Sequence, residues 1–224
     1  MKPYSHTISS GLELGLSLSR RSVTAALLFS GLAAGMAGGV AGIAARGAYA
    51  AEAMTQDMVM GKADAPITII EYASFTCPHC ASFHAQTLPG LKKAWIDTGK
   101  AKLIFRDFPL DEMAFNASKL ARCADESRYF AFVDVLFRQQ GQWARSSDPI
   151  AALGKLGRLG GIGKARFDAC LSDETLGNAI LQSRVTGASE FEVNSTPTLI
   201  INGEKHAGAL SFEELDRVLV KLAP

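Results

Sequence analysis

The feature that most constrains the fold is a cysteine pair, Cys77 and Cys80, placed between an apolar segment and a helical one. Residues 67–72 are β-branched and apolar, which is typical of a buried central strand. The helical stretch that follows the cysteines ends at Gly99, and residues 102–108 form a second apolar segment. Strand, helix and strand at this spacing predict a βαβ unit with the cysteines at the start of its helix.

The position at a helix start gives the first sulfur a specific chemistry. A helix N-terminus carries about half a positive elementary charge and unpaired N–H groups, and both stabilise a thiolate at Cys77. His79, inside the motif, adds a donor or a positive charge. The thiolate is the form that exchanges, and stabilising it makes the disulfide a better oxidant. We therefore expect an exposed, acidic Cys77, a buried Cys80, and a less oxidising protein when His79 is replaced by Pro or Gly.

A zinc site is the main alternative for a pair of cysteines with this spacing. Structural zinc needs four ligands, commonly supplied as two close pairs. The remaining cysteines, Cys123 and Cys170, stand alone and far apart, and His84 is the only nearby histidine outside the motif. We therefore expect no metal and no cofactor, and favour a redox pair.

Two further positions are candidates for the same site. Glu71 lies within the first apolar strand, shortly before Cys77. It is either a strand-end glutamate that reaches water or, as we favour, a buried acid that moves a proton to or from Cys80. Thr196-Pro197 precedes a later strand. This proline is either a simple strand-start proline or part of a loop lying against the cysteine motif.

The second half of the chain is first helical and then returns to strand. Residues from about 112 to 189 have a helical pattern, which predicts a helical insertion. Residues 198–201 are apolar and are followed by Asn202-Gly203, a strong hairpin-turn signal. A capping box, Ser211 to Glu214, opens a closing helix.

The N-terminal residues predict export. Arg20-Arg21 precedes an uncharged apolar stretch, residues 22–45, and the small-residue pattern Ala48-Tyr49-Ala50. This order is typical of a cleaved signal over residues 1–50, of either the twin-arginine or the general secretory type. A membrane anchor and a buried helix are the alternatives. Disulfides persist in exported proteins, and the net charge of +1 gives no sign of a nucleic-acid partner.

Several motifs together resemble the DsbA-like thiol:disulfide oxidoreductases of the thioredoxin superfamily. The resemblance covers nearly all of residues 55–224. Its motifs are Asp64-Ala65-Pro66, Phe75-Thr76-Cys77-Pro78-His79-Cys80, Phe105-Arg106-Asp107-Phe108-Pro109-Leu110 and Thr196-Pro197-Thr198. The family implies an α/β fold, a thioredoxin fold with an inserted helical subdomain, over residues 51–224.

The resemblance also implies roles for individual residues. Cys77 is implied as the attacking cysteine and Cys80 as the resolving one, with Glu71 as the buried acid and Pro197 as a cis-proline. The Pro78-His79 pair is typical of the oxidising branch of the family. Many oxidases carry Val where this chain has Thr196, and isomerase-type relatives also carry Thr. Thr196 therefore does not distinguish an oxidase from an isomerase.

By resemblance, the chain is a periplasmic donor of disulfides to exported proteins with free cysteines. A membrane partner of the DsbB type, linked to quinone, would reoxidise it. A disulfide isomerase or reductase and a non-enzymatic periplasmic chaperone are the alternatives. Isomerase relatives carry an extra N-terminal dimerisation domain, whereas only residues 51–65 lie here between the predicted cleavage site and Pro66. We therefore expect a monomer.

The last expectation concerns the second cysteine pair. Cys123 and Cys170 each lie on an apolar helical face within the predicted insertion. Two buried free thiols are the alternative, because cysteine is commonly a small core residue. Some DsbA relatives have a second disulfide in this subdomain and others lack it, so the resemblance permits the bond. We expect a structural disulfide between these two residues.

Overall fold

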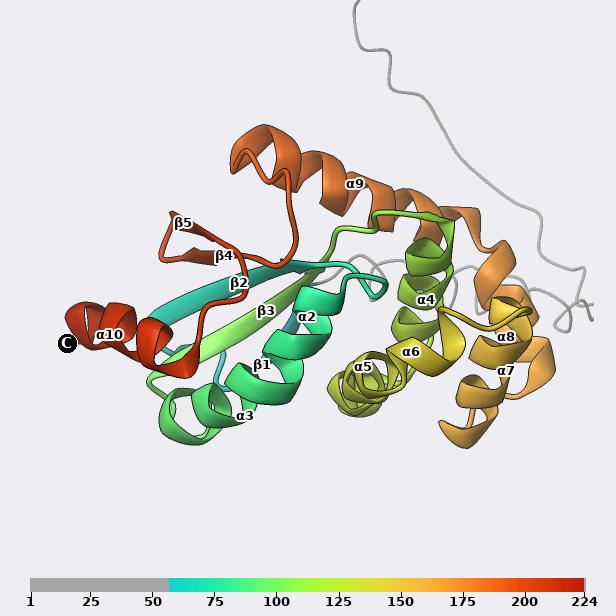
Figure 1. Ribbon diagram of the computed structural model, residues 1–224, viewed down its shortest axis with the longest axis horizontal. Helices are drawn as coiled ribbons and strands as arrows, with labels where there is room; N and C mark the ends of the chain where they lie inside the picture. Colours follow the sequence, from blue (N-terminus) through green and yellow to red (C-terminus); the bar gives the residue numbers. More distant parts are fainter. Residues whose placement is uncertain (1–56, 224) are drawn as a thin grey trace, which may run out of the picture. The chain divides into compact units, whose positions relative to one another are not determined.

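The computed structural model of the chain describes residues 57–223. The predicted export signal, with Arg20-Arg21 and Ala48-Tyr49-Ala50, lies outside the described residues. Five strands form one mixed sheet in the order β1-β3-β2-β4-β5 (Figure 1). Their bounds are β1 Met58–Met60, β2 Ile67–Ala73, β3 Ala101–Asp107, β4 Thr198–Ile201 and β5 Glu204–Ala207.

The central strand of the sheet is β2, as its apolar sequence predicts. It runs parallel to β3, with Ile67 opposite Ala101, and antiparallel to β4, with Ile69 opposite Ile201. The short strand β1 pairs antiparallel with β3 at one edge, and β5 pairs with β4 at the other. Because β2 and β3 are parallel, the segments that follow them leave the sheet at the same edge.

Helices fill the connections between the strands. Those between β2 and β3 are α2 Pro78–Ser82, η1 Phe83–Thr87, α3 Leu88–Leu91 and η2 Lys92–Ile96. Those between β3 and β4 are α4 Glu112–Arg122, η3 Glu126–Arg128, α5 Tyr129–Arg138, α6 Gln140–Trp143, α7 Pro149–Leu159, α8 Lys164–Ser172 and α9 Glu174–Glu190. After β5 comes α10 Phe212–Leu222.

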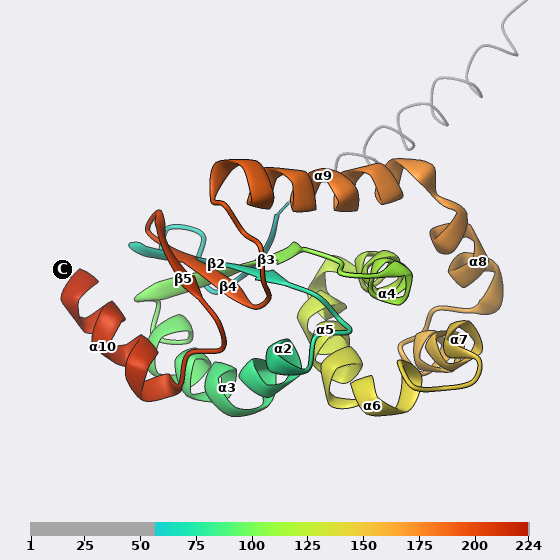
Figure 2. The same cartoon turned by 45° about the horizontal axis from the view of Figure 1, so that its top comes forward.

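Helices cover both faces of the sheet. Figure 2 shows the α2–α3 run and α10 on one face and α9 on the other. On the first face, the α2–η2 run buries Phe83, Leu91 and Trp95 in one cluster with Ile69 and Leu215. A separate buried cluster on the other face includes Tyr72 and Val193. The thioredoxin fold predicted from the sequence is confirmed.

The insertion between β3 and β4 is helical, as predicted, and has its own core. Its helices pack α4 against α7, α8 and α9. One boundary differs from the sequence pattern, because the apolar spacing from Leu120 to Leu136 suggested a single helical segment. The structure instead ends α4 at Arg122 and starts α5 at Tyr129. A buried ion pair between Asp107 and Arg122, at 2.8 Å, joins the end of β3 to α4.

The Pro89-Gly90 pair does not break the helical run, although proline inside a helix commonly kinks or breaks it. Pro89 lies in the first turn of α3, where its missing N–H costs least. A π-helical segment, η1, directly precedes α3 and absorbs the change in hydrogen bonding. The run then ends near Gly99, which adopts φ +76, a conformation that glycine permits.

The C-terminal part forms as its turn residues predict. Asn202 and Gly203 both have positive φ, at 46° and 93°, as a two-residue hairpin of the type I′ kind requires. Ser211 and Glu214 form the reciprocal capping box at the start of α10. Among residues 57–223, the structure has no helix with the length and apolar character needed to cross a membrane.

Candidate active site

The cysteine motif lies where β2 ends and α2 begins. Cys77 is the N-cap residue of α2, with an extended backbone, and Pro78 occupies the first helical position. Proline suits this position because its fixed φ matches the helix and it has no N–H to satisfy. Both cysteines are free thiols in the structure. The sequence therefore places the two sulfurs at a helix N-terminus, as predicted.

Cys77 has a strongly acidic thiol. Its pKa is lowered to about 5, mainly because the Cys80 thiol donates a hydrogen bond to its sulfur. Burial acts in the opposite direction, while the Thr196 side chain and the backbone N–H groups of Cys80 and His79 also favour the thiolate. A thiolate stabilised at neutral pH is the form that attacks and leaves in disulfide exchange.

Cys80 has the opposite character. Its side chain is fully buried. The pKa of Cys80 is raised, first by burial, then by its hydrogen bond to Cys77 and by the nearby negative charge of Glu71. One sulfur of the pair is therefore held as a thiolate and the other as a thiol, which separates an attacking role from a resolving role.

The prediction that Cys77 is exposed is wrong for the dithiol form. Only 6% of the residue is accessible, against the open position that the sequence predicted. In its thiol form, Cys77 Sγ donates to the carbonyl oxygen of Thr196 at 3.1 Å, a contact across 119 positions of sequence. The loop before β4 therefore covers the sulfur, and a contact of such long range leaves no trace in the local pattern.

That covering loop contains the proline that the sequence singled out. The Thr196-Pro197 peptide bond is cis, and both residues are buried. The hydroxyl Oγ1 of Thr196 is also buried and makes no hydrogen bond with the described residues while Cys77 is a thiol, so it is free to donate to the Cys77 thiolate. The loop therefore presents a carbonyl oxygen and a hydroxyl next to Cys77.

Glu71 is buried, and the structure gives it a partner that sequence reasoning missed. It is fully inaccessible, so it is not a strand-end glutamate that reaches water. His84 Nε2 lies 3.1 Å from both carboxylate oxygens of Glu71. The His84 ring packs on Phe137 with 4.2 Å between ring centroids. A signal for His84 exists in the sequence, because it follows Cys80 by one helical turn and so shares its helix face.

Gln140 ties the helical insertion to the cysteine motif. Its side-chain amide nitrogen donates to the carbonyl oxygens of Phe75, at 2.7 Å, and Cys77, at 2.9 Å. On the same side, Thr76 donates to Asp111 Oδ2 at 2.7 Å. Neither contact was predicted, because each joins residues far apart in the sequence.

The two residues inside the motif point to solvent. Pro78 and His79 are both exposed. The contact of His79 with the Cys77 sulfur runs through its backbone N–H. The proposed effect of the His79 imidazole on the redox potential therefore stays a prediction.

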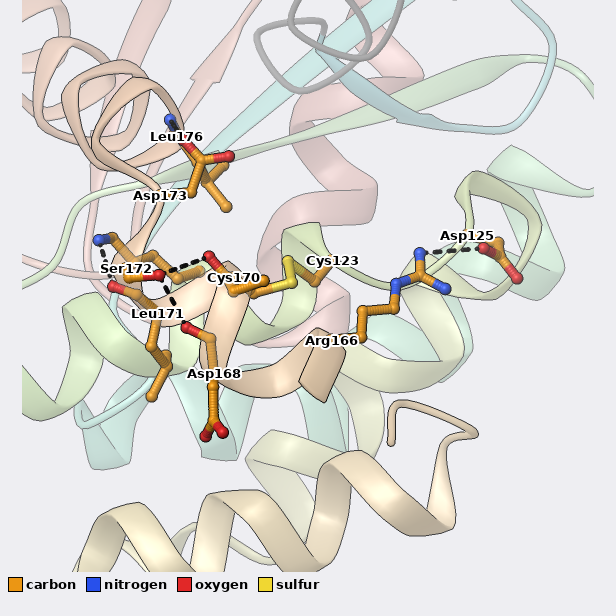
Figure 3. The surroundings of a disulfide bond; sticks show 11 residues. Cys123, Asp125, Arg166, Asp168, Cys170, Leu171, Ser172, Asp173 and Leu176 are labelled. Carbon is orange, nitrogen blue, oxygen red and sulfur yellow. Dashed lines mark hydrogen bonds and ion pairs between the residues drawn. A yellow bond between two sulfur atoms is a disulfide. The ribbon is translucent and has the colours of Figure 1, made fainter. Parts of the chain in front are cut away.

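The second cysteine pair is bonded in the structure. Cys123, at the end of α4, and Cys170, in α8, form a disulfide with 6.2 Å between their Cα atoms (Figure 3). Both residues are buried in the core of the helical insertion. Within residues 57–223, no group of three His, Cys, Asp or Glu side chains is placed to hold a metal ion.

Comparison with known proteins places this geometry in a family. A family model described as thioredoxin matches residues 53–221. The chain belongs to the thioredoxin family. The crystal structure of Wolbachia pipientis α-DsbA1 superposes with a TM-score of 0.70 and 31% sequence identity, over 75% of this chain and 90% of that one. The DsbA-like resemblance deduced from the sequence is thereby confirmed.

Curated relatives agree with this assignment. A candidate protein-disulfide oxidoreductase of Rickettsia bellii is 36% identical over 150 residues, which are 66% of this chain and 57% of the relative. A similar protein of Rickettsia felis is 32% identical over 74% of this chain and 59% of the relative. The chain therefore spans somewhat over half the length of the curated relatives that it matches.

Proposed function

We propose that this chain is an exported thiol:disulfide oxidoreductase that donates disulfides to proteins with free cysteines. The observation that carries the proposal is the paired environment of Cys77 and Cys80 at one helix start. The pKa of Cys77 is lowered to about 5, and the Cys80 thiol that donates to it is fully buried. Such a pair supports exchange at the sulfur of Cys77, with Cys80 as the buried resolving group.

The exchange proceeds in two displacements. A substrate thiolate attacks Cys77 Sγ of the oxidised protein, breaking the Cys77–Cys80 bond and forming a mixed disulfide. The electron pair of the broken bond goes to Cys80, which becomes a thiolate and takes up a proton. A second substrate thiolate then attacks the substrate sulfur of the mixed disulfide and releases the Cys77 thiolate. The substrate is oxidised by two electrons and the protein is reduced.

The Glu71–His84 pair supplies the proton that Cys80 needs. Cys80 is fully buried, so water does not deliver the proton directly. Glu71 is near enough for its charge to raise the pKa of Cys80. His84 shares its Nε2 between both oxygens of Glu71, so the buried carboxyl has a neighbour that holds or returns a proton. In the reverse direction, the same pair takes the proton of Cys80 when the protein is reoxidised.

The stabilised thiolate also favours the direction of the proposed reaction. Interactions that stabilise the reduced form make the disulfide more oxidising. Four groups favour the Cys77 thiolate: the Cys80 thiol, the Thr196 side chain and the backbone N–H groups of Cys80 and His79. We propose reoxidation by a membrane partner of the DsbB type, and action as a monomer.

Export is part of the same proposal. Arg20-Arg21, the apolar residues 22–45 and Ala48-Tyr49-Ala50 support a signal that sends the chain to the periplasm. The disulfide between Cys123 and Cys170 agrees with an oxidising compartment, because such bonds persist there.

Equilibrium titration of the mature protein against glutathione tests the proposal. We expect a reduction potential nearer that of DsbA, about −120 mV, than that of thioredoxin, about −270 mV. A value near that of thioredoxin would overturn the donor function. A disulfide isomerase is the second candidate, because Thr196 precedes Pro197. Faster recovery of activity from a scrambled-disulfide substrate than from a reduced one would favour it.

A further inference from the structure

A cavity of about 270 Å³ opens beside the cysteine motif, at the boundary between the thioredoxin fold and the helical insertion. The active-site turn contributes Thr76 and Pro78 to its lining. The insertion contributes Asp111, Met113, Gln140 and Arg145, among others. Since Thr76 and Pro78 are the chain neighbours of Cys77, the cavity begins within one residue of the reactive cysteine.

The two charged residues of the lining are not equivalent. Asp111 caps α4, where the positive end of the helix offsets its charge. Its two carboxylate oxygens already accept hydrogen bonds, Oδ1 from the N–H of Ala114 and Oδ2 from the hydroxyl of Thr76. Arg145 is exposed and makes no ion pair or hydrogen bond with any residue between 57 and 223. The cavity therefore offers a positive charge that is not engaged in an ion pair, beside a carboxylate whose two oxygens are already occupied.

The wall nearest the cysteine is held in place. The two hydrogen bonds from Gln140 to Phe75 and Cys77 fix the position of α6 relative to the motif. Arg145 follows α6 by one residue beyond its C-cap, Ala144. A site whose walls are fixed before binding loses less free energy in ordering when a ligand enters.

The distance from the nucleophile defines which part of a substrate reaches the cavity. An extended polypeptide advances about 3.3 Å per residue. A substrate whose thiolate attacks Cys77 therefore brings residues one to three positions from its own cysteine to the cavity. A volume of about 270 Å³ is enough for one such side chain, and Met113 with Pro78 provides apolar contact for its methylene groups.

We propose that this cavity is a substrate subsite that receives an acidic side chain close to the reactive cysteine of the substrate. Arg145 is its specificity-determining residue, and Gln140 fixes its wall. The proposal rests on the thiol exchange proposed above and names the substrate feature that the same site selects. The subsite adds recognition of charge to a disulfide exchange that does not itself depend on the residues around the substrate cysteine.

Stopped-flow measurement of mixed-disulfide formation tests the subsite. The oxidised protein is mixed with peptides that carry one cysteine and Glu, Gln or Lys at each of three positions on either side of it. We expect Glu to react about two- to five-fold faster than Gln at one position, and Lys more slowly than Gln, as an exposed ion pair allows. Raising the ionic strength should shrink the ratio, because the charges are accessible to salt.

Variants identify the residue responsible. We expect Arg145→Gln to reduce the Glu-to-Gln rate ratio to about one and Arg145→Glu to invert it, with each variant's Gln peptide as its internal reference. Arg217→Gln on α10 is the matched control, since it removes the same charge from an exposed position far from the cavity. We expect the wild-type ratio in this control.

Two results would overturn the subsite. One is a Glu-to-Gln ratio of one at every peptide position in the wild type, and the other is an unchanged ratio in Arg145→Gln. Both are distinct from failure of the proposed function, which would show as no exchange between the wild-type disulfide and dithiothreitol. That last result would remove the subsite together with the function.

Discussion

Two cysteine pairs occur in the described chain, and their surroundings differ in almost every respect. Cys77 and Cys80 are separated by Pro78 and His79 and share one helix start. Cys123 and Cys170 are separated by 47 positions and join two helices of the insertion. The first pair is free and the second is bonded in the same structure.

The difference shows what makes a cysteine reactive. Both pairs are buried, so accessibility alone does not distinguish them. What distinguishes them is the set of donors around one sulfur, which lowers the pKa of Cys77 to about 5. The second pair instead closes a long loop, which stabilises a fold by restricting the unfolded chain. Reactivity therefore follows from local hydrogen bonds and stabilisation from sequence separation.

The largest expected effect separates the two pairs by activity. Cys77→Ser removes the sulfur that is attacked, so we expect no measurable disulfide transfer to a reduced protein substrate. The double variant Cys123→Ser/Cys170→Ser should retain transfer at the temperature where it remains folded. Measurable transfer by Cys77→Ser would show that another sulfur carries the reaction.

The second effect separates the pairs by stability. Removing the Cys123–Cys170 bond, with both residues changed to Ser, should lower the free energy of unfolding by about 4 kcal/mol for a loop of this length. Urea unfolding measures the change. The matched Cys77→Ser/Cys80→Ser variant is compared with the wild type whose Cys77–Cys80 bond alone is reduced. At pH 4, below the Cys77 pKa of about 5, the thiolate contributes no stability, so this variant should change much less. Equal losses in the two variants would contradict a structural role confined to the second pair.

A third effect tests how the proton reaches the reactive pair. Glu71→Gln keeps the size of the side chain and removes its acid function, so we expect mixed-disulfide formation to slow by about 100-fold, within the usual range for general acid–base catalysis. Quenched-flow mass spectrometry follows this step. Asp107→Asn is the control, because Asp107 is an equally buried carboxylate whose ion pair is with Arg122 and not with the reactive pair. A rate in Glu71→Gln equal to that of the control would exclude Glu71 as the proton donor.

The last effect is a pH dependence confined to the first pair. The thiolate absorbance of the reduced protein should titrate with a midpoint at the pKa of Cys77, about 5. Because that pKa lies below the value of the unfolded chain, about 8.5, the reduced fold has its full stabilisation above pH 8.5 and loses it as the pH falls through 5.

The oxidised protein lacks this titration, and so does Cys77→Ser. The free energy of unfolding in urea should therefore differ more between pH 4 and pH 8.5 for the reduced wild type than for the oxidised protein or for Cys77→Ser. A single midpoint near pH 8.5 in the wild type would contradict the acidic sulfur.

Much of this molecule follows from local sequence. The βαβ unit around the cysteines, the Asn202-Gly203 hairpin and the capping box at Ser211 each depend on residues close together in the chain, and each forms as predicted. The helical insertion between β3 and β4 follows from its periodicity for the same reason.

Most of the contacts at the site that sequence reasoning missed join residues distant in the sequence. The carbonyl oxygen of Thr196 accepts a hydrogen bond from the Cys77 thiol, and the side-chain amide of Gln140 donates to the carbonyl oxygen of Cys77. The pairing of Glu71 with His84 depends on how β2 and the helical run pack. Local pattern indicates which residues carry chemistry, but the packing of the whole domain decides which of them meet.

The origin of the cavity walls has an evolutionary consequence. The sulfur chemistry uses residues 71–84 and the turn at 196–197, whereas most of the wall comes from residues 111–145. Both segments begin where the parallel strands β2 and β3 end, so the fold itself brings them side by side. Under the proposed subsite, mutations in the inserted helices would change which substrates react fastest and leave the residues of the redox centre unchanged. Grafting the insertion of one relative onto the thioredoxin frame of another is accordingly a direct way to retarget such an enzyme.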